Sequence, residues 1–216
     1  MGGQLTPAEF HRSEATGDWH AVFTGACAVF STRSFERGME LAREIARLAE
    51  AAHHHPDLDL RYAVVTVRLW SHDVDGLSER DVALAAAISG AARALGIEAD
   101  PGAVQGVKVA VDAWDIPRVL PFWQAVLGYR RRGDADLVDG AGRGPSVWFQ
   151  QLDEPRRGRC RLHVDVAVTR EAVGGRVAAA LEAGGRLVSD SHAPTWWTLA
   201  DPEGNEVDVA VLAGRG

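Results

Sequence analysis

Hydrophobic residues in the first half of the chain follow two different periods. Between residues 35 and 52 they recur every three to four positions, which predicts an amphipathic helix after an N-cap at Ser34. Between residues 60 and 70 apolar side chains alternate along the chain, which predicts one strand with a buried face. Short strands are expected within residues 21–30, and a second helix from about residue 78 to 95. This mixture of strands and helices is typical of an α+β domain.

The second half of the chain repeats one pattern of elements, a strand and a helix followed by further strands. The expected elements are strands at 107–111 and 146–151 around a helix at 117–127, then a strand at 162–168, a helix at 171–183 and strands at 186–189, 196–199 and 206–212. A polar, glycine-rich stretch at 133–144 is expected to form a mobile hairpin loop. Two consecutive units of about 50 residues are therefore predicted.

A change in composition divides the two halves. Six of the eight histidines lie before residue 73, whereas glycine is more frequent in the second half. The sequence Asp-Pro-Gly at 100–102 is a turn and linker signal. We therefore expect one domain at 1–100 and a second at 101–216.

The overall composition narrows the class of protein. With 46% hydrophobic and 25% charged residues, the 216-residue chain has the balance of a globular protein. A net charge of −7 argues against binding to nucleic acid or to membrane surfaces, which requires a basic face. We find no signal peptide and no apolar run of the roughly 18–20 residues that span a bilayer. The two cysteines, Cys27 and Cys160, do not suggest a disulfide framework, so a cytoplasmic location is expected.

Histidines gather where predicted elements of the first domain end. His53, His54 and His55 follow the first helix and precede Pro56, and His72 follows the strand at 60–70. Imidazole can donate or accept a proton near neutral pH. Two or three such groups in one cleft can serve as acid and base at different atoms of one substrate.

Each of these residues also has an explanation without catalysis. The histidine run can bond the free carbonyls of the helix end and complement its dipole, or contribute to a zinc site. Ser78 and Asp81 match a capping box, which accounts for Asp81 by itself. Glu50 can be a solvated residue of the last helical turn, and Trp19 can be an anchor of the core.

Over residues 5–95 the sequence resembles the pterin-4a-carbinolamine dehydratase family. The residues that carry the resemblance are Trp19, Phe30, Phe35, Ala49-Glu50, His54-His55-Pro56, Tyr62, Ser71-His72-Asp73 and Gly76-Leu77-Ser78-Glu79-Arg80-Asp81. The resemblance implies a four-stranded antiparallel sheet with helices on one face. It also implies a homodimer or homotetramer.

The implied reaction is loss of water from 4a-hydroxytetrahydropterin to give quinonoid dihydropterin, without a metal or another cofactor. The resemblance assigns the catalytic role to His54, His55 and His72. It assigns Glu50 and Asp81 as orienting or pterin-binding residues, and Trp19 as a wall of the pocket.

The second half resembles the vicinal-oxygen-chelate superfamily, which includes glyoxalase I and bleomycin-resistance proteins. The resemblance covers residues 106–213, rests on the segments 122–129 and 201–206, and implies paired βαβββ modules. At the superfamily's metal positions the chain has Lys108, His163 and Asp208. A lysine there repels a divalent ion, so we expect a cup without metal. The candidate residues of this second pocket are Trp114, Trp148, Trp196, Trp197 and His163; core packing is the alternative for each tryptophan.

The leading hypothesis is a pterin dehydratase with an accessory domain that binds a small molecule. The alternative is a non-catalytic oligomeric protein that sequesters an aromatic metabolite or antibiotic. A third hypothesis gives the second domain an enzymatic activity of its own.

Overall fold

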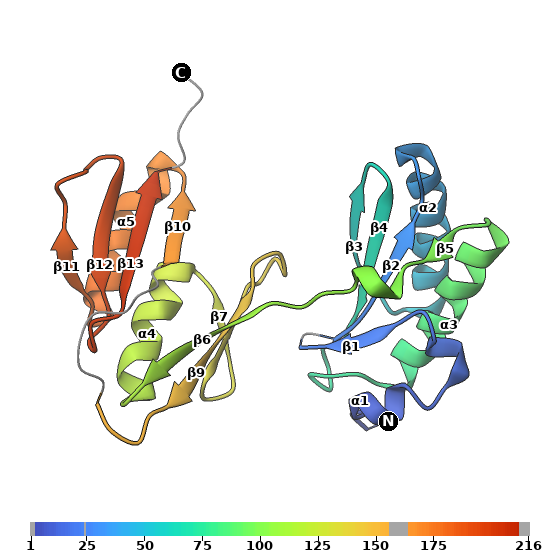
Figure 1. The fold of residues 1–216 in the computed structure, drawn as a ribbon, viewed down its shortest axis with the longest axis horizontal. Helices are drawn as coiled ribbons and strands as arrows, with labels where there is room; N and C mark the ends of the chain where they lie inside the picture. The colour runs from blue at the N-terminus through green and yellow to red at the C-terminus, as the bar shows by residue number, and fades with distance from the viewer. Residues whose placement is uncertain (1–2, 24, 156–163, 212–216) are drawn as a thin grey trace. The chain divides into compact units, whose positions relative to one another are not determined.

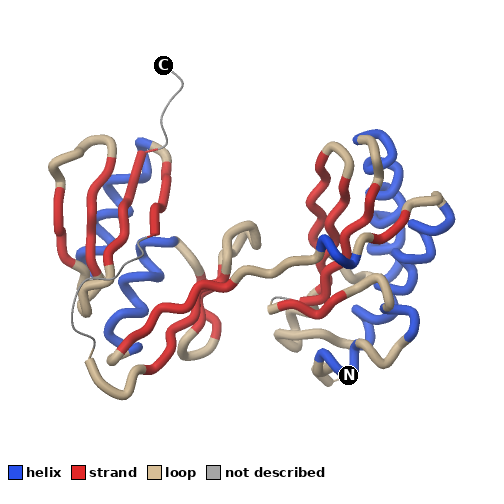
Figure 2. Tube along the Cα trace, viewed as in Figure 1, coloured by secondary structure: helices blue, strands red, loops and turns tan. Residues whose placement is uncertain are grey.

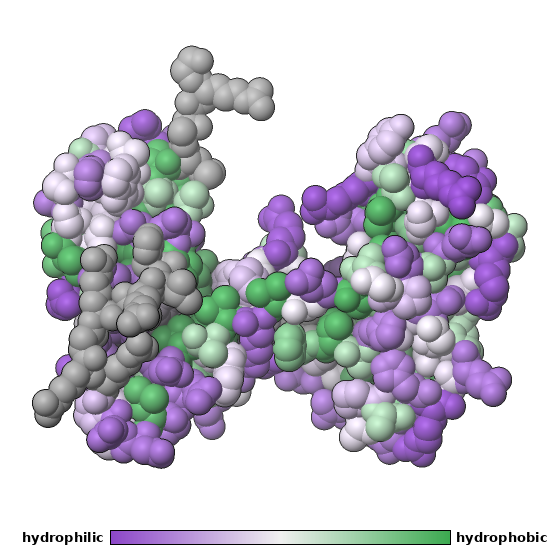
Figure 3. Space-filling view, in the orientation of Figure 1, coloured by the Kyte–Doolittle hydropathy of each residue, from purple (hydrophilic) through white to green (hydrophobic). Residues whose placement is uncertain are grey.

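The computed structural model describes residues 3–23, 25–155 and 164–211 (Figure 1). The chain forms two compact units, Met1–Gly106 and Val107–Gly216, which are described separately. Within the described residues, no helix is both long enough and apolar enough to cross a bilayer. The face drawn in Figure 3 mixes hydrophilic residues with small hydrophobic patches.

The first unit is an antiparallel sheet with both long helices on one face (Figures 1 and 2). Its strands have the order β1-β2-β4-β3, and the short β5 also pairs with β2. The elements are α1 (Pro7–Phe10), η1 (Glu14–Thr16), β1 (His20–Val22), β2 (Gly25–Ser31), α2 (Phe35–Ala52), β3 (Asp57–Arg61), β4 (Val64–Leu69), α3 (Glu79–Ala94), β5 (Glu98–Ala99) and η2 (Pro101–Ala103). The predicted four-stranded sheet with helices on one face is confirmed, with β5 as an addition.

The core of this unit lies between the sheet and the two helices. Alternate residues of β2 and β4 face the apolar stripes of α2 and α3. Fully buried side chains include Phe30, Val65, Val67, Leu69, Leu41, Ile45 and Ile88. Burying each large apolar side chain contributes about 1.5–3 kcal/mol. This packing holds the adjacent ends of α2 and α3 in a fixed relation.

One predicted strand of the first unit is in fact a hairpin. Residues 60–70 were expected to form a single strand, but β3 ends at Arg61 and β4 begins at Val64, the residue that pairs with it. Tyr62 and Ala63 form the two-residue connection. The apolar alternation continues through this connection, which has none of the Asn-Gly or Asp-Gly signals of tight hairpins. The period alone therefore does not reveal the turn.

The second unit consists of two βαβββ modules, as predicted. The first contains β6 (Lys108–Ala113), α4 (Ile116–Leu127), β7 (Arg130–Arg132), β8 (Asp136–Val138) and β9 (Ser146–Gln151); the second contains β10 (Val164–Val168), α5 (Arg170–Glu182), β11 (Arg186–Ser189), β12 (Trp196–Ala200) and β13 (Glu206–Val211). In each module the first and last strands pair in parallel, and the sheet orders are β6-β9-β8-β7 and β10-β13-β12-β11. The stretch 133–144, expected to be a loop, contains strand β8.

A buried aspartate organises the turn between β12 and β13. Asp201 accepts hydrogen bonds from the indole Nε1 of Trp123 at 3.0 Å, and from the backbone N–H groups of Glu203 and Asn205, each at 2.9 Å. The carboxylate of Glu203 in turn accepts the backbone N–H groups of Trp114 and Asp115 ahead of α4. This turn therefore has a structural role.

Candidate active site

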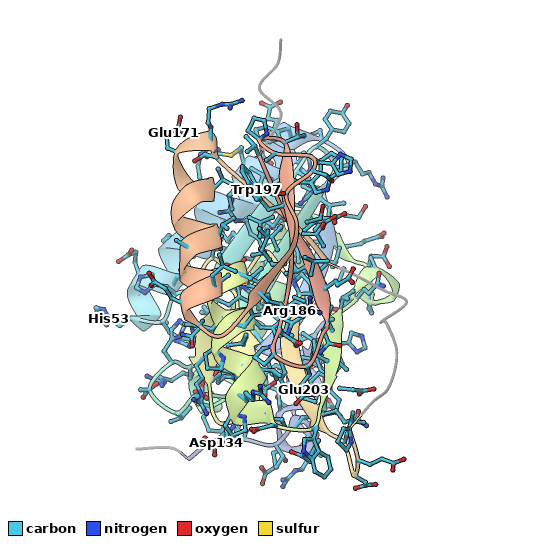
Figure 4. All side chains as sticks on the ribbon, turned by 90° about the vertical axis from the view of Figure 1, so that its left-hand side faces the viewer. His53, Asp134, Glu171, Arg186, Trp197 and Glu203 are labelled. Carbon is cyan, nitrogen blue, oxygen red and sulfur yellow. The ribbon has the colours of Figure 1, made fainter. Side chains whose placement is uncertain are left out.

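The end of helix α2 determines where the three consecutive histidines point. His53 adopts the left-handed conformation (φ 48°, ψ 37°), and its N–H bonds the carbonyls of Ala49 and Glu50. The N–H of His54 reaches back to the carbonyl of Ala49 at 3.1 Å, which closes the helix end. The side chain of His53 extends to the outside of the molecule (Figure 4). His53 is thus a helix cap, and the reversal leaves His54 buried.

His54 forms a buried pair with Asp81. Its side chain is 8% exposed, that of Asp81 is 0% exposed, and Nε2 lies 2.8 Å from the carboxylate Oδ1. An ionised carboxylate only accepts hydrogen bonds, so Nε2 carries the proton. The other ring nitrogen, Nδ1, is then the atom through which His54 can exchange a proton with a substrate.

The second oxygen of Asp81 connects the pair to the turn before α3. Oδ2 accepts from Ser71 Oγ at 2.7 Å, from the backbone N–H of Ser78 at 2.7 Å and from Ser78 Oγ at 3.0 Å. The Ser78–Asp81 capping box expected from the sequence is present. The carboxylate of Asp81 therefore has two roles: Oδ2 caps α3 and Oδ1 binds His54.

The other two predicted catalytic histidines are accessible to solvent. His55 Nε2 lies 3.3 Å from Glu50 Oε1, and both side chains are mostly exposed, which makes this a weak pair. His72 is exposed and directly follows Ser71. Hydrogen bonds therefore connect His54 through Asp81 to Ser71, the residue before His72. His55 is adjacent to His54 in sequence.

Asp73 lies at the edge of the same region. The Arg80 side chain, which donates a hydrogen bond to it, lowers the pKa of the Asp73 carboxyl, and His54 contributes in the same direction. Asp73 is therefore close enough to His54 to interact electrostatically with it.

Trp19 lies in the core of the first unit. It is 1% exposed, its Nε1 donates to Ser89 Oγ at 3.1 Å, and its ring meets Phe30 edge to face at 6.3 Å. The burial of Trp19 agrees with the alternative that this residue anchors the core.

Sequence reasoning found Ser78 as a partner of Asp81 through the capping box, but missed the hydroxyl group of Ser71. The hydroxyls of the two serines also contact each other at 2.7 Å, and both serines are buried. The capping-box spacing indicated Ser78. For Ser71 the only signal was its position at the end of a strand, directly before His72.

In the second unit, one face of the first sheet carries an aromatic and charged cluster. Lys108 Nζ lies 2.5 Å from Asp136 Oδ1 and 5.5 Å from the centre of the Trp148 ring. The strand register pairs Asp136 with Trp148. Val109 and Val111, whose side chains point to the other face, pack in the core. The cluster therefore occupies the face of the sheet that α4 does not cover.

The other residues predicted for this pocket do not form one group. Trp114 is exposed before α4, and Trp196 stacks on His192 with ring centres 4.0 Å apart. Trp197, the next residue of β12, points to the opposite face and packs against the core. His163 lies outside the described residues.

The described residues contain no metal-binding cluster. Among them, no group of three or more His, Cys, Asp or Glu side chains is arranged to hold a metal ion. Asp208, which lies at a metal position of the superfamily that the second half resembles, accepts a hydrogen bond from Thr198 Oγ1 at 2.6 Å.

Comparison with known proteins agrees with this division of the chain. Residues 4–91 match the family model described as pterin 4 alpha carbinolamine dehydratase, and residues 108–210 match the one described as a glyoxalase-like domain. A relative from Chloroflexus aurantiacus, provisionally named pterin-4-alpha-carbinolamine dehydratase, is 44% identical over 71 residues, 33% of this chain and 76% of its own. The chain belongs to the pterin-4-alpha-carbinolamine dehydratase family. Both resemblances expected from the sequence are thereby confirmed.

Two solved structures similar to this dehydratase-family chain each cover one half of it. A transcriptional coactivator/pterin dehydratase from Brucella melitensis is 26% identical, with a TM-score of 0.38, over 42% of this chain and 99% of its own. A glyoxalase/bleomycin resistance protein/dioxygenase family enzyme from Burkholderia phytofirmans PsJN is 22% identical, with a TM-score of 0.40, over 49% of this chain and 97% of its own.

Proposed function

We propose that the first unit catalyses the dehydration of a 4a-hydroxytetrahydropterin. The observation that carries this proposal is the buried His54–Asp81 pair. An accessible histidine follows each of two residues of this network: His55 follows His54, and His72 follows Ser71, which bonds Asp81. Membership of the dehydratase family supports the same assignment.

The reaction requires an acid and a base at two atoms of one substrate. The bond between C4a and its hydroxyl oxygen breaks, and the oxygen takes up a proton and leaves as water. N5 loses its proton, and the C4a–N5 double bond of the quinonoid product forms. One imidazolium and one neutral imidazole supply these two functions, each through a positioned proton transfer.

The three histidines differ in how far their orientation is fixed. Asp81 holds His54 in one tautomer and one orientation, as an orienting carboxylate does for a catalytic histidine. The exposed His55 and His72 can adjust to the bound substrate. We assign Glu50, which contacts His55, to orienting that ring.

The direct test is a dehydratase assay with enzymatically generated 4a-hydroxytetrahydropterin. We expect the wild-type protein to exceed the spontaneous rate, and the His54→Ala/His55→Ala double variant to fall to it. The matched control is His53→Asn, because asparagine also tolerates the left-handed conformation and His53 points outward. This variant should retain the wild-type rate.

A wild-type protein that is folded yet no faster than the double variant would refute the proposal. The first unit would then be a scaffold, and the alternative of a non-catalytic oligomeric binding protein would replace the dehydratase. Light scattering after gel filtration tests the accompanying expectation of a homodimer or homotetramer.

For the second unit we propose that a planar small molecule binds at the open face of its first sheet, which is the face that α4 does not cover. The supporting observation is the side-by-side placement of Lys108 and Trp148, since an aromatic face and a cation suit a flat, polar ligand. Titration of tryptophan fluorescence with planar heterocycles tests this proposal. Saturable quenching that disappears in Trp148→Leu supports it, and the absence of saturable quenching in the wild type contradicts it.

A further inference from the structure

A small cavity lies at the end of the α2–α3 helix pair that is remote from the histidines. Its volume is about 170 Å³, and it is lined by residues 31–34 and Arg37 at the start of α2 and by residues 96–98 after α3. Helix α2 has 18 residues, so it separates this cavity from His54 by about 27 Å. The cavity is therefore distinct from the proposed dehydratase site.

Thr32, in the wall of this cavity, has a buried hydroxyl without a partner. The residue is 1% exposed, and its Oγ1 forms no hydrogen bond within the part of the chain that the structure describes. Buried polar groups are nearly always hydrogen-bonded, so such a hydroxyl calls for an explanation, such as a bound ion or water. The backbone is held in place by hydrogen bonds from the N–H groups of Thr32 and Arg33 to the carbonyl of Ala63.

The same wall contains the start of a long helix. Ser34 is the N-cap of α2, and its hydroxyl accepts the N–H of Arg37 at 3.3 Å. For the N–H groups of Phe35 and Glu36 no partner is found among the described residues. Free N–H groups at a helix N-terminus, together with the helix dipole, favour a bound anion.

Two arginines line the cavity. Arg37 is held at the end of α3, where its Nη2 donates to the carbonyl of Leu95, and its Nη1 lies 3.5 Å from Glu40 Oε2. Arg33 is only loosely paired, because its Nη2 is 3.9 Å from Glu98 Oε2 and both side chains are 84% exposed. An anion can therefore replace Glu98 as the partner of Arg33 at little cost.

We propose that this cavity binds a phosphate-sized oxyanion, either inorganic phosphate or the phosphate group of a small monoester. Guanidinium groups, hydroxyls and helix N–H groups are the donors that recognise phosphate oxygens. The cavity suits one phosphate group and is small compared with the 300–1,000 Å³ of typical organic-ligand pockets.

Isothermal titration calorimetry of the full chain tests the proposal, with inorganic phosphate and glycerol 3-phosphate as separate ligands. Sodium chloride keeps the ionic strength constant. We expect saturable binding that weakens about tenfold in Arg33→Gln, because one charge-assisted hydrogen bond is lost. Thr32→Val keeps the side-chain shape and removes the hydroxyl, and should weaken binding about threefold. The control Arg47→Gln removes an exposed arginine of α2 that does not line the cavity, and should change affinity less than about twofold.

Absence of saturable phosphate and monoester binding to the wild type would overturn the proposal. Equal losses in Arg33→Gln and Arg47→Gln would also overturn it, since they would indicate nonspecific charge attraction. Thermal melting shows whether each variant is folded. If one of Arg33→Gln and Thr32→Val is unfolded, the affinity of the other variant decides whether the proposal stands. Tighter binding of glycerol 3-phosphate than of phosphate would identify a monoester as the ligand, and the reverse would identify free phosphate.

Discussion

Replacing Asp81 by asparagine should separate the structural role of this residue from its effect on His54. The carboxylate accepts four hydrogen bonds: one from His54 on Oδ1 and three from Ser71 and Ser78 on Oδ2. An asparagine whose carbonyl takes the Oδ2 position keeps the three bonds from the serines. Its NH2 group then faces His54 Nε2, which must give up its proton and become an acceptor.

The expected effect on stability is moderate. Bonds to a charged acceptor contribute about 1.5–3 kcal/mol each and neutral ones about 0.5–1.5 kcal/mol, and part of this difference is recovered because the neutral amide is easier to bury. We expect Asp81→Asn to lower the free energy of unfolding by about 1–2 kcal/mol. Asp81→Ala removes both acceptor oxygens, and with them all four hydrogen bonds, and should cost about 3–5 kcal/mol.

The expected effect on catalysis is larger, because the tautomer of His54 changes. A misplaced proton abolishes the contribution of this group to acid–base catalysis, which is about 10²–10⁴-fold in rate. The dehydratase assay measures this loss. Hydrogen exchange of the α3 amides, followed by mass spectrometry, reports stability for the first unit alone, since the two units need not unfold together.

The control is Asp59→Asn, which removes the same charge from an exposed pair with Arg61 on β3. It should change stability by less than about 0.5 kcal/mol and leave the rate unchanged. The reasoning fails if Asp81→Asn retains the wild-type rate. It also fails if the asparagine variant is as unstable as the alanine variant, because the serine contacts would then not be preserved.

Three further predictions concern Trp19, Asp139 and the binding of a divalent metal. Trp19→Ala should cost about 3–5 kcal/mol in urea unfolding, because the ring is buried and its Nε1 bonds Ser89; a raised KM with unchanged stability would instead make it a pocket wall. Burial alone would raise the pKa of Asp139, but the N–H groups of Gly144, Ala141 and Arg143 outweigh it and lower the pKa. The pKa of Asp139 is thus lower in the folded protein than in the unfolded chain. The ionised Asp139 carboxylate therefore stabilises this loop fully above about pH 4, and this stabilisation is lost as the pH falls through the folded-state pKa. A pH titration of the Gly144 amide by NMR tests this, and a midpoint at the ordinary aspartate pKa would contradict it. Purified protein should hold a divalent metal only in substoichiometric amounts, because Lys108 places a cation on the open sheet face; one equivalent by elemental analysis would refute this.

Strong local signals made much of the fold predictable. The helix predicted at 35–52 coincides with α2, because the apolar stripe, the Ser34 cap and Pro56 all indicate the same limits. The β3–β4 hairpin was not predicted, because its turn carries no glycine or asparagine and does not interrupt the alternation. The period of the apolar residues thus predicts whether a segment is a helix or a strand. A turn can be predicted only where its residues differ in type from those of the flanking strands.

The candidate site was only partly predictable for a similar reason. The sequence shows three consecutive histidines but does not show which one is buried, because that depends on the left-handed conformation of His53. Spacing also cannot show that Ser71 reaches Asp81, since their contact joins a strand end to a helix start through tertiary packing. Trp196 and Trp197 are adjacent in sequence, yet strand geometry places them on opposite faces.

The antiparallel packing of α2 and α3 accounts for the chemistry at both ends of the pair. His54 after α2 meets Asp81 at the start of α3, and Arg37 at the start of α2 meets Leu95 at the end of α3. At the first end, the C-terminal pole of the α2 dipole and the N-terminal pole of the α3 dipole both lie at the His54–Asp81 pair. At the other end the polarity is reversed, so α2 offers free N–H groups while the α3 carbonyl holds an arginine beside them. The same helix pair therefore positions the proposed proton-transfer site at one end and the proposed anion site at the other.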